Sequence, residues 1–202
     1  MDTVTKQKTM TETHPFKEFI PNKSYVLLLG SFPGKESTQN KREGDWYYGA
    51  NRNQFWKILE EIFQRDFRDL NSKQKLFGDL GVGITDIIRS CKRAENKNID
   101  ANLTDIVYNI ETINSILDSN SIEKILFTSQ WVEREFTNKI EPRLNRKNFR
   151  KIILPSPSPI YRRLTLKQKA DIYKKHFPTV SLEFIERISE PLGLKIVKRD
   201  DN

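Results

Sequence analysis

Hydrophobic residues along the chain form short uninterrupted runs of strand length. Tyr25-Val-Leu-Leu-Leu29 contains four aliphatic residues in a row and stops at Ser31-Phe-Pro-Gly34. An apolar run of this kind is typical of a strand that is buried on both faces of a parallel sheet. Three further short runs predict strands at residues 81–85, 122–127 and 151–154.

Between these runs the apolar positions take helical spacing. Phe55, Ile58, Leu59 and Ile62 recur at i, i+3, i+4 and i+7, which predicts an amphipathic helix starting after Gln54. The same reasoning predicts a long helix over residues 103–117 and helices over 131–140 and 182–188. Thr165-Leu-Lys-Gln168 has the pattern of a capping box and predicts a helix that continues to about Phe177.

Predicted strands and helices alternate without a repeat or a low-complexity linker. This order predicts an α/β fold, a three-layer sandwich with a central, mostly parallel sheet of about four strands flanked by helices. Residues 1–20 are polar and are expected to be a flexible arm, residues 21–180 a single domain, and residues 181–202 a helical extension with a charged tail. Ligands of such sheets bind at the carboxyl ends of the strands.

The composition narrows the classes of function. Lys and Arg number 35 against 27 Asp and Glu, a net charge of +8 that favours a polyanionic partner. A single cysteine, Cys91, excludes an internal disulfide, a cysteine-rich zinc site and a four-cysteine iron–sulfur cluster. No apolar run reaches the ~20 residues that span a bilayer, and the first ten residues lack the apolar core of a signal peptide. We therefore expect a cytoplasmic protein without a membrane partner.

Three segments carry candidate chemistry. Gly30-Ser-Phe-Pro-Gly34 directly follows the first predicted strand, and its glycines allow a backbone to approach a phosphate or a sugar, although a plain turn explains it as well. It lacks the residues of a P-loop and the spacing of a dinucleotide-binding turn. Leu154-Pro-Ser-Pro-Ser-Pro159 and the arginines after it offer hydroxyl groups and charge to phosphate, or form a polyproline-type connector.

The third segment, Trp46 to Trp56, contains five aromatic residues in front of the predicted helix. Phe55 and Trp56 belong to the helix stripe and are expected in the core. Tyr48 precedes the helix and offers a ring on which a base can stack. Asn53 stands where a helix N-cap is expected, so it either caps the helix or takes part in a site.

Together these segments resemble the uracil-DNA glycosylase superfamily. The pattern GSFPG, YYxxxRNxFW, GVGxTD and LPSxSP occurs in the right order from about Tyr25 to His176. Within the superfamily it is most similar to the hypoxanthine (deoxyinosine) DNA glycosylases, near the mismatch-specific branch. The resemblance implies a parallel sheet between helices and no cofactor or metal.

The resemblance also implies roles for individual residues. It places catalytic functions at Ser31, Phe32 and Asn53. Many relatives have an Asn, Asp or Glu at the position of Phe32. The hypoxanthine branch instead uses an asparagine at the position of Asn53 to position water. The resemblance places base binding at Tyr48, Asp86 and Phe32, although Asp86 also fits the cap of a helix after Thr85. Backbone, hydroxyl groups and charge beside these motifs predict DNA binding at seven positions: Gly34, Lys35, Arg52, Ser156, Ser158, Arg162 and Arg163. Leu154 stands where relatives have a histidine. Glu36, Glu43 and Asp45 are nearby acids that either assist or only carry surface charge.

The function that these observations predict is a monofunctional DNA glycosylase that hydrolyses the N-glycosidic bond of a deaminated base, hypoxanthine or uracil, flipped out of DNA. One alternative is a weakly active or inactive nucleic-acid-binding protein of the same fold. Another is an α/β hydrolase or transferase that acts on a small nucleotide. We expect the protein to act as a monomer on DNA that contains a damaged or mismatched base.

Overall fold

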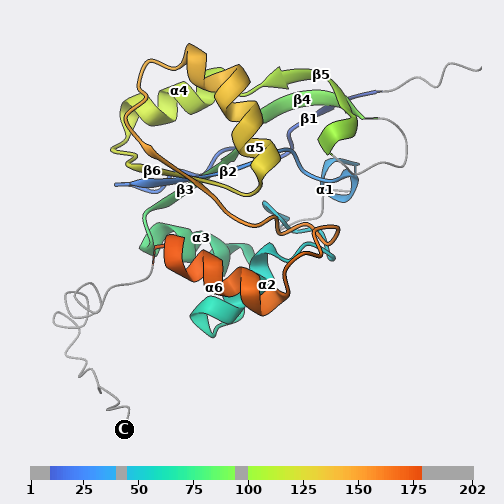
Figure 1. Cartoon of the computed structure of the whole chain (residues 1–202), viewed down its shortest axis with the longest axis vertical. Coiled ribbons are helices and arrows are strands. Elements are labelled where there is room, and N and C mark those ends of the chain that lie inside the picture. The colour runs from blue at the N-terminus through green and yellow to red at the C-terminus, as the bar shows by residue number, and fades with distance from the viewer. Residues whose placement is uncertain (1–9, 40–44, 94–99, 179–202) are drawn as a thin grey trace, which may run out of the picture.

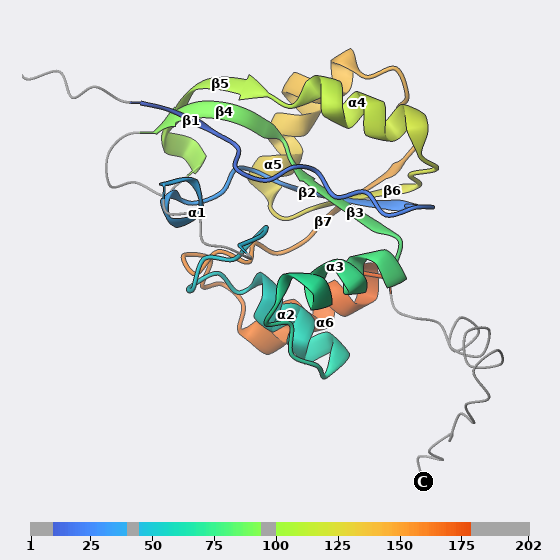
Figure 2. The same ribbon diagram turned by 180° about the vertical axis from the view of Figure 1, so that it is seen from behind.

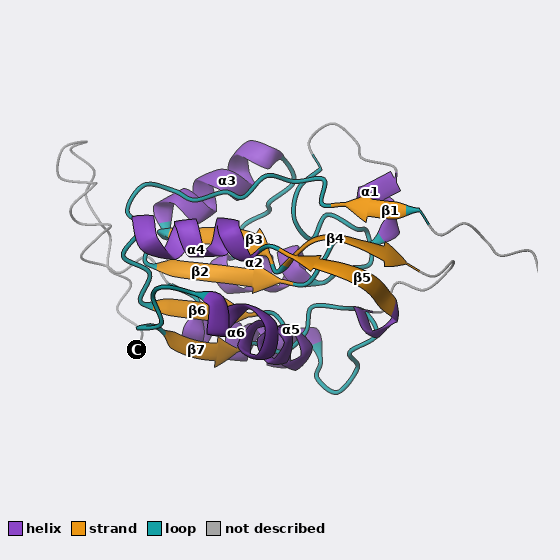
Figure 3. Cartoon of the chain, turned by 90° about the horizontal axis from the view of Figure 1, so that it is seen from above, coloured by secondary structure: helices purple, strands orange, loops and turns teal. Residues whose placement is uncertain are grey.

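A four-stranded parallel sheet forms the middle layer of the computed structural model, which describes residues 10–39, 45–93 and 100–178 (Figure 1). Its strands lie in the order β3 (Val82–Asp86), β2 (Val26–Gly30), β6 (Lys124–Phe127) and β7 (Arg150–Ile153), as Figure 3 shows from above. All three strand pairs are parallel. The predicted sheet is therefore confirmed in strand number, direction and approximate bounds.

Helices cover both faces of this sheet, which confirms the three-layer prediction. One face carries α2 (Phe55–Phe63), α3 (Leu70–Asp79) and α6 (Leu166–His176), and the other carries α4 (Ile110–Ser119) and α5 (Gln130–Glu135) (Figures 1 and 2). After α5 the chain continues in a π-helical turn, Phe136–Ile140, and a 3-10 turn, Glu141–Arg143. The capping box at the start of α6 is also confirmed, with both of its reciprocal hydrogen bonds formed.

Strand β2 explains why an uninterrupted apolar run was needed at this place. Val26 and Leu28 belong to one hydrophobic cluster, together with residues of α2, α3 and α6. Leu27 and Leu29 belong to the other cluster, together with residues of α4 and α5. Successive side chains of a strand point to opposite faces, so a central strand with helices on both sides requires apolar residues throughout.

A second, antiparallel sheet was not predicted. It contains β1 (Thr11–Thr13), β4 (Ile88–Arg93) and β5 (Leu103–Tyr108) in the order β1-β4-β5. The long helix expected over residues 103–117 is thus wrong in its first half, because the helix begins only at Ile110. Apolar residues of the strand and of the helix fall in one helical register across the junction, but Val107 is half exposed and does not lie on a buried stripe.

The expected flexible arm also needs correction. Within residues 10–20, β1 pairs with β4, and Phe19 forms a backbone bridge with Ile84. Phe16 and Phe19 pack against the core cluster on the α2 side. These residues were misjudged because backbone hydrogen bonds hold the polar Thr-Glu-Thr strand in place, and such bonds leave no apolar pattern in a sequence. The rest of the expected division into arm, domain and tail stays a prediction.

Some predicted features lie outside the described residues: residues 1–9, Glu43, and the helical extension and tail at 181–202. A short helix, α1 (Lys35–Gln39), follows the loop after β2. None of the helices in the described part of the chain is long and apolar enough to cross a membrane.

Candidate active site

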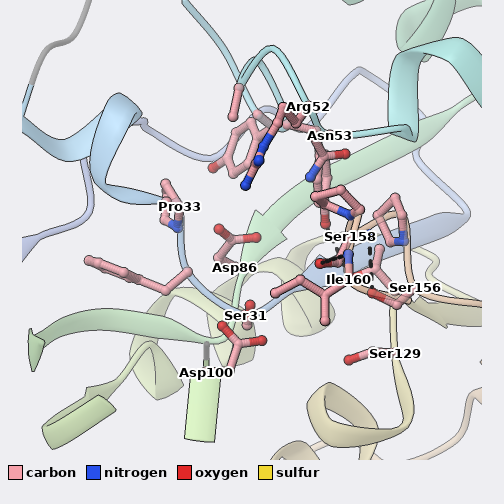
Figure 4. A pocket seen from close by; sticks show the side chains of 18 of the residues that line it. Ser31, Pro33, Arg52, Asn53, Asp86, Asp100, Ser129, Ser156, Ser158 and Ile160 are labelled. Atoms are coloured by element: carbon pink, nitrogen blue, oxygen red, sulfur yellow. Dashed lines mark hydrogen bonds between the residues drawn. The ribbon is translucent and has the colours of Figure 1, made fainter. Parts of the chain in front are cut away.

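A pocket of about 220 Å³ lies at the carboxyl ends of the parallel strands (Figure 4). Each of the four strands contributes to it: Ser31 follows β2, Asp86 ends β3, Ser129 follows β6 and Ser156 follows β7. The parallel topology therefore brings together the segments at the carboxyl ends of all four strands, where ligands of such sheets were expected.

Nine of the predicted site residues line this pocket: Ser31, Phe32, Gly34, Tyr48, Arg52, Asn53, Asp86, Ser156 and Ser158. The other three do not line it. Lys35 begins α1 directly after Gly34, and Arg162 and Arg163 are exposed on the loop that leads to α6. The structure thus gathers the residues predicted for catalysis and base binding, and it leaves these three cations outside the pocket.

The loop after β2 packs closely against the base of the pocket. At Gly30 a Cβ atom would collide with Asp86 Oδ1 and with the Tyr48 hydroxyl group, so this position requires glycine. Phe32 is almost buried, belongs to the hydrophobic cluster on the α4 side and forms one wall of the pocket. Its phenyl ring carries no group that can exchange a proton. The catalytic role predicted for Phe32 stays a prediction.

A buried arginine that sequence reasoning missed holds this loop. Arg93, near the end of β4, donates from Nη2 to the Pro33 carbonyl oxygen at 2.7 Å, and its guanidinium lies over the Phe32 ring at 5.6 Å from the centroid. Its Nε lies 3.2 Å from Glu12 Oε1 of β1. The antiparallel sheet therefore supports the loop that follows the parallel strand β2.

Tyr48 lines the pocket with one face of its ring already occupied. Phe55 stacks on it with a centroid distance of 4.3 Å and an interplanar angle of 25°. The hydroxyl group donates to Thr128 Oγ1 at 3.3 Å. Burial raises the pKa of Tyr48 well above its ordinary value, so the side chain is neutral. Phe55 thus excludes a base from this face, and stacking on Tyr48 would have to use the opposite face.

Asn53 lines the pocket one residue before the N-cap of α2, which is Gln54 and not Asn53 as expected. Its Oδ1 accepts a hydrogen bond from the backbone N–H of Phe55, the first residue of α2, at 2.9 Å. Its amide nitrogen has no protein hydrogen-bond partner among the described residues, and Figure 4 shows the side chain beside Arg52 at the pocket. The oxygen is used by the helix, which leaves the N–H groups for a ligand or a water.

Asp86 lies near the centre of the pocket in Figure 4 and is 5% exposed. Its Oδ2 is 2.9 Å from His14 Nε2, whereas its Oδ1 is buried and accepts no hydrogen bond from the described residues. The alternative role as a helix cap is wrong, because the chain continues from Asp86 into strand β4. A buried acceptor without a donor is costly, and a ligand that brings a donor removes that cost.

Asp100 is a second carboxyl group in the pocket and was not predicted. It lies in the 3-10 turn Asp100–Asn102 before β5, and the Ser31 hydroxyl group hydrogen-bonds to it. Burial, and then the neighbouring charge of Asp86, raise the pKa of Asp100 to about 6, although the Ser31 hydrogen bond and Arg93 oppose the shift. The polar residues around Asp100 gave no sequence signal, since only the pairing of β5 with β4 brings it to the pocket.

The loop after β7 is shaped by its own hydroxyl groups. Ser156 Oγ accepts from the Ser158 backbone N–H at 3.2 Å, and Ser158 Oγ accepts from the Ile160 N–H at 3.4 Å. The Pro157 carbonyl oxygen accepts from the Gln54 backbone N–H at 2.9 Å, which ties the loop to the start of α2. Ile160, at the pocket, is 62% exposed.

A buried side chain of α6 also holds Gln54, the residue that contacts the loop after β7. Lys169 is fully buried, and its Nζ donates to Gln54 Oε1 at 2.7 Å. Burial lowers the pKa of Lys169.

In the described part of the chain no three His, Cys, Asp or Glu side chains gather in a group that could hold a metal ion.

Comparison with known proteins agrees with this geometry. Residues 16–177 match the family model of the uracil DNA glycosylase superfamily. A hypoxanthine DNA glycosylase from Methanosarcina barkeri (strain Fusaro / DSM 804) is 29% identical over 85 residues, which cover 41% of this chain and about half (51%) of that relative. A Methanosarcina acetivorans protein solved by NMR in solution, provisionally named a uracil DNA glycosylase, superposes with a TM-score of 0.64 at 19% identity. This alignment covers 83% of the present chain and 97% of that protein, and it supports the fold. Since the family model spans the whole sheet and every described residue of the pocket, the chain belongs to the uracil DNA glycosylase superfamily.

Proposed function

We propose that the protein is a monofunctional DNA glycosylase, which hydrolyses the N-glycosidic bond of a deaminated base, hypoxanthine or uracil, flipped out of DNA. The observation that carries this proposal is the unpartnered Oδ1 of Asp86, a buried acceptor in a pocket with an aromatic wall. Family membership supports the reaction class, and the hypoxanthine DNA glycosylase among the relatives supports the choice of base.

The pocket has the groups needed to hold such a base. Hypoxanthine and uracil both present a ring N–H beside a carbonyl group, and an ionised carboxylate can accept from that N–H. Asp86 Oδ1 supplies the acceptor, and the open face of Tyr48 supplies the stacking surface. A carboxylate cannot donate to the carbonyl oxygen, so we expect less strict selection between the two bases than an asparagine would give.

Hydrolysis further requires a held water and a proton acceptor. The water oxygen bonds to the sugar C1′ while the C1′–N bond breaks, and the bonding electron pair leaves with the base. We assign the orientation of the water to the Asn53 amide group and the acceptance of its proton to Asp100. Asp100 thereby supplies the carboxylate that the Phe32 position lacks, and its hydrogen bond to Ser31 connects it to the same loop.

The surroundings of the pocket suit a DNA duplex. Arg52 at the pocket, Lys35 beside it and the exposed Arg162 and Arg163 offer charge to phosphates. The exposed Ile160 is an apolar side chain that can fill the gap left in the base stack when a nucleotide is extruded. We also propose that the protein acts as a monomer and works in the cytoplasm.

The test is an excision assay on oligonucleotides that contain inosine, uracil, xanthine or a G·T mismatch. We expect abasic sites at inosine or uracil, seen as strand breaks only after alkali. Breaks before alkali would contradict the monofunctional assignment. Salt-sensitive binding without abasic sites would favour the inactive DNA-binding alternative, and release of base from free nucleotides alone would favour an enzyme of nucleotide metabolism.

A further inference from the structure

We infer that His14 determines the base specificity of the site by positioning Asp86. It holds one carboxylate oxygen by a hydrogen bond and leaves the other oxygen to accept from a ligand. This inference rests on the proposed function, in which Asp86 reads a ring N–H. The pair His14–Asp86 thereby admits hypoxanthine and rejects adenine, whose N1 presents a lone pair in place of the N–H.

The contact between the two side chains is short and shielded. His14 Nε2 lies 2.9 Å from Asp86 Oδ2, and the side chains are 10% and 6% exposed. Against a carboxylate, Nε2 can act only as a donor. Water competes little for a pair in such surroundings, so the interaction is stronger than a comparable pair on the surface.

The imidazole ring is fixed from several sides. Its Nδ1 lies 2.8 Å from the carbonyl oxygen of Phe16 and 3.2 Å from the Phe16 backbone nitrogen. The rings of Phe16, Phe32 and Tyr47 surround it with centroid distances of 5.9, 5.7 and 5.5 Å. The His14 backbone N–H donates to the Arg89 carbonyl oxygen at 2.8 Å, which attaches it to the neighbouring strand β4. The orientation of Nε2 toward Asp86 is therefore determined by the fold.

The charges around Asp86 make this donor necessary. Asp100 faces it from the turn before β5, and Tyr47 and Tyr48 face it from the loop before α2. Asp100 is a further carboxyl group, and burial keeps both tyrosines neutral. Among the described residues, His14 supplies the side-chain hydrogen bond to the Asp86 carboxylate. Without it, no hydrogen bond from a described side chain fixes the orientation of this carboxylate.

The orientation of the Asp86 carboxylate decides which base fits. With Oδ2 held by His14, Oδ1 is placed to accept from N1–H of hypoxanthine and repels the N1 lone pair of adenine. A carboxylate that is not held in this orientation no longer places an acceptor at N1. Loss of the His14 donor should therefore weaken binding of hypoxanthine more than binding of adenine, so that the protein discriminates less well between the two bases.

The test uses duplexes with 2′-fluoro-2′-deoxyinosine or 2′-fluoro-2′-deoxyadenosine, because the fluorine stops cleavage and permits equilibrium binding. We expect the ratio of the two dissociation constants to fall by about tenfold in His14→Phe, which keeps an aromatic ring and removes the N–H that holds the charged carboxylate. His14→Gln keeps a donor and should retain most of the ratio. His14→Leu replaces the phenylalanine variant if melting shows that the latter does not fold.

The same measurement in an Asp86→Asn background separates positioning from packing. An asparagine can turn either its oxygen or its N–H groups to the base, so discrimination at N1 is already lost and adding His14→Phe should leave the ratio unchanged there. Equal weakening of both ligands by His14→Phe in the Asp86 protein, with the ratio intact, would overturn the inference. Absence of inosine excision by the unchanged protein would instead refute the proposed function, so the two failures are distinguishable.

Discussion

The two ends of the Asn53 amide have different neighbours, and this allows its roles to be separated. In Asn53→Ser a hydroxyl oxygen replaces the acceptor that Phe55 uses, and serine makes such local hydrogen bonds to the backbone N–H two residues on, more weakly than asparagine does. We expect the free energy of unfolding to change by less than about 1 kcal/mol. Base release should fall by roughly 10²-fold, because the positioned N–H donors are lost. Thermal melting and single-turnover excision measure the two effects, and parallel losses in both would show that Asn53 serves only the helix.

Asp100 should control the pH dependence of the reaction. With a pKa of about 6, it is a proton acceptor only above that pH, so excision should decline as the pH falls through about 6. Asp100→Asn should lower the rate and remove this acidic limb. Asp105→Asn is the matched control. Asp105 is an exposed carboxylate on β5, the strand that directly follows the turn with Asp100, and it pairs with Lys92. A profile that declines near pH 6 in both variants would exclude Asp100 as the acceptor.

The same residue links activity to stability. Its pKa in the folded protein is higher than the ordinary value of 3.8, so the ionised group is disfavoured by folding. The protein should therefore gain stability from this group as the pH is lowered from above 6 towards 4. Asp100→Asn should be more stable than the parent protein at neutral pH and should lack this gain. Melting curves across the range measure it, and a destabilised Asp100→Asn at neutral pH would contradict the assignment.

Site residues were predictable where a local pattern identified them. Tyr48 and Asn53 stand in an unusual aromatic segment before a helix, and Asp86 ends a buried strand. His14 and Asp100 had no such pattern. Antiparallel pairing with β4 brings Asp100 to the pocket and His14 against Asp86, so both positions depend on contacts between segments far apart in the sequence.

At the scale of elements, we expect the restrained loop after β7 to assist the extrusion of a base from duplex DNA. Ile160 is 62% exposed at its end, where two serine turns and the hydrogen bond to Gln54 restrain the backbone. Ile160→Ala should reduce excision from duplex DNA by about tenfold and leave excision from single strands unchanged, because unstacking a duplex costs a few kcal/mol and a single strand needs little of it.

Val107→Ala is a suitable control for the loop, since Val107 is also half exposed but lies on β5 and does not line the pocket. It should behave like the parent protein on both substrates. Equal losses of Ile160→Ala on duplex and single strands would assign Ile160 to general binding and not to base extrusion.

Elements with strong periodicity were predicted well. The fully apolar β2, the amphipathic α2 and the capping box of α6 each carry a local signal that the structure confirms. The antiparallel sheet was missed because β1 and β4 are rich in polar residues, and because β5 runs into α4 with apolar residues in a common register. Backbone pairing of an outer sheet depends on its partners more than on its own composition.

At the scale of the whole molecule, the net charge of +8 predicts DNA binding that depends strongly on salt. Each phosphate contact releases counterions, so replacing Arg162 and Arg163 by alanine should reduce the slope of log K against log salt by about 1–2. Arg68 and Lys75, whose charges pair with Asp66 and Asp79, provide a control double variant that should leave the slope unchanged. Affinity that does not vary between low and physiological salt would remove the electrostatic argument.

The order of the strands has a consequence for synthesis on the ribosome. Leu29 of β2 pairs with Phe127 of β6, so the central strand emerges about a hundred residues before its neighbour on that side exists. At roughly 5–20 residues per second, this aliphatic stretch remains uncovered for about 5–20 s. During that interval it is a binding site for chaperones or for other nascent chains. The strand that later forms the middle of the sheet is thus the segment most exposed to aggregation while the chain is being made.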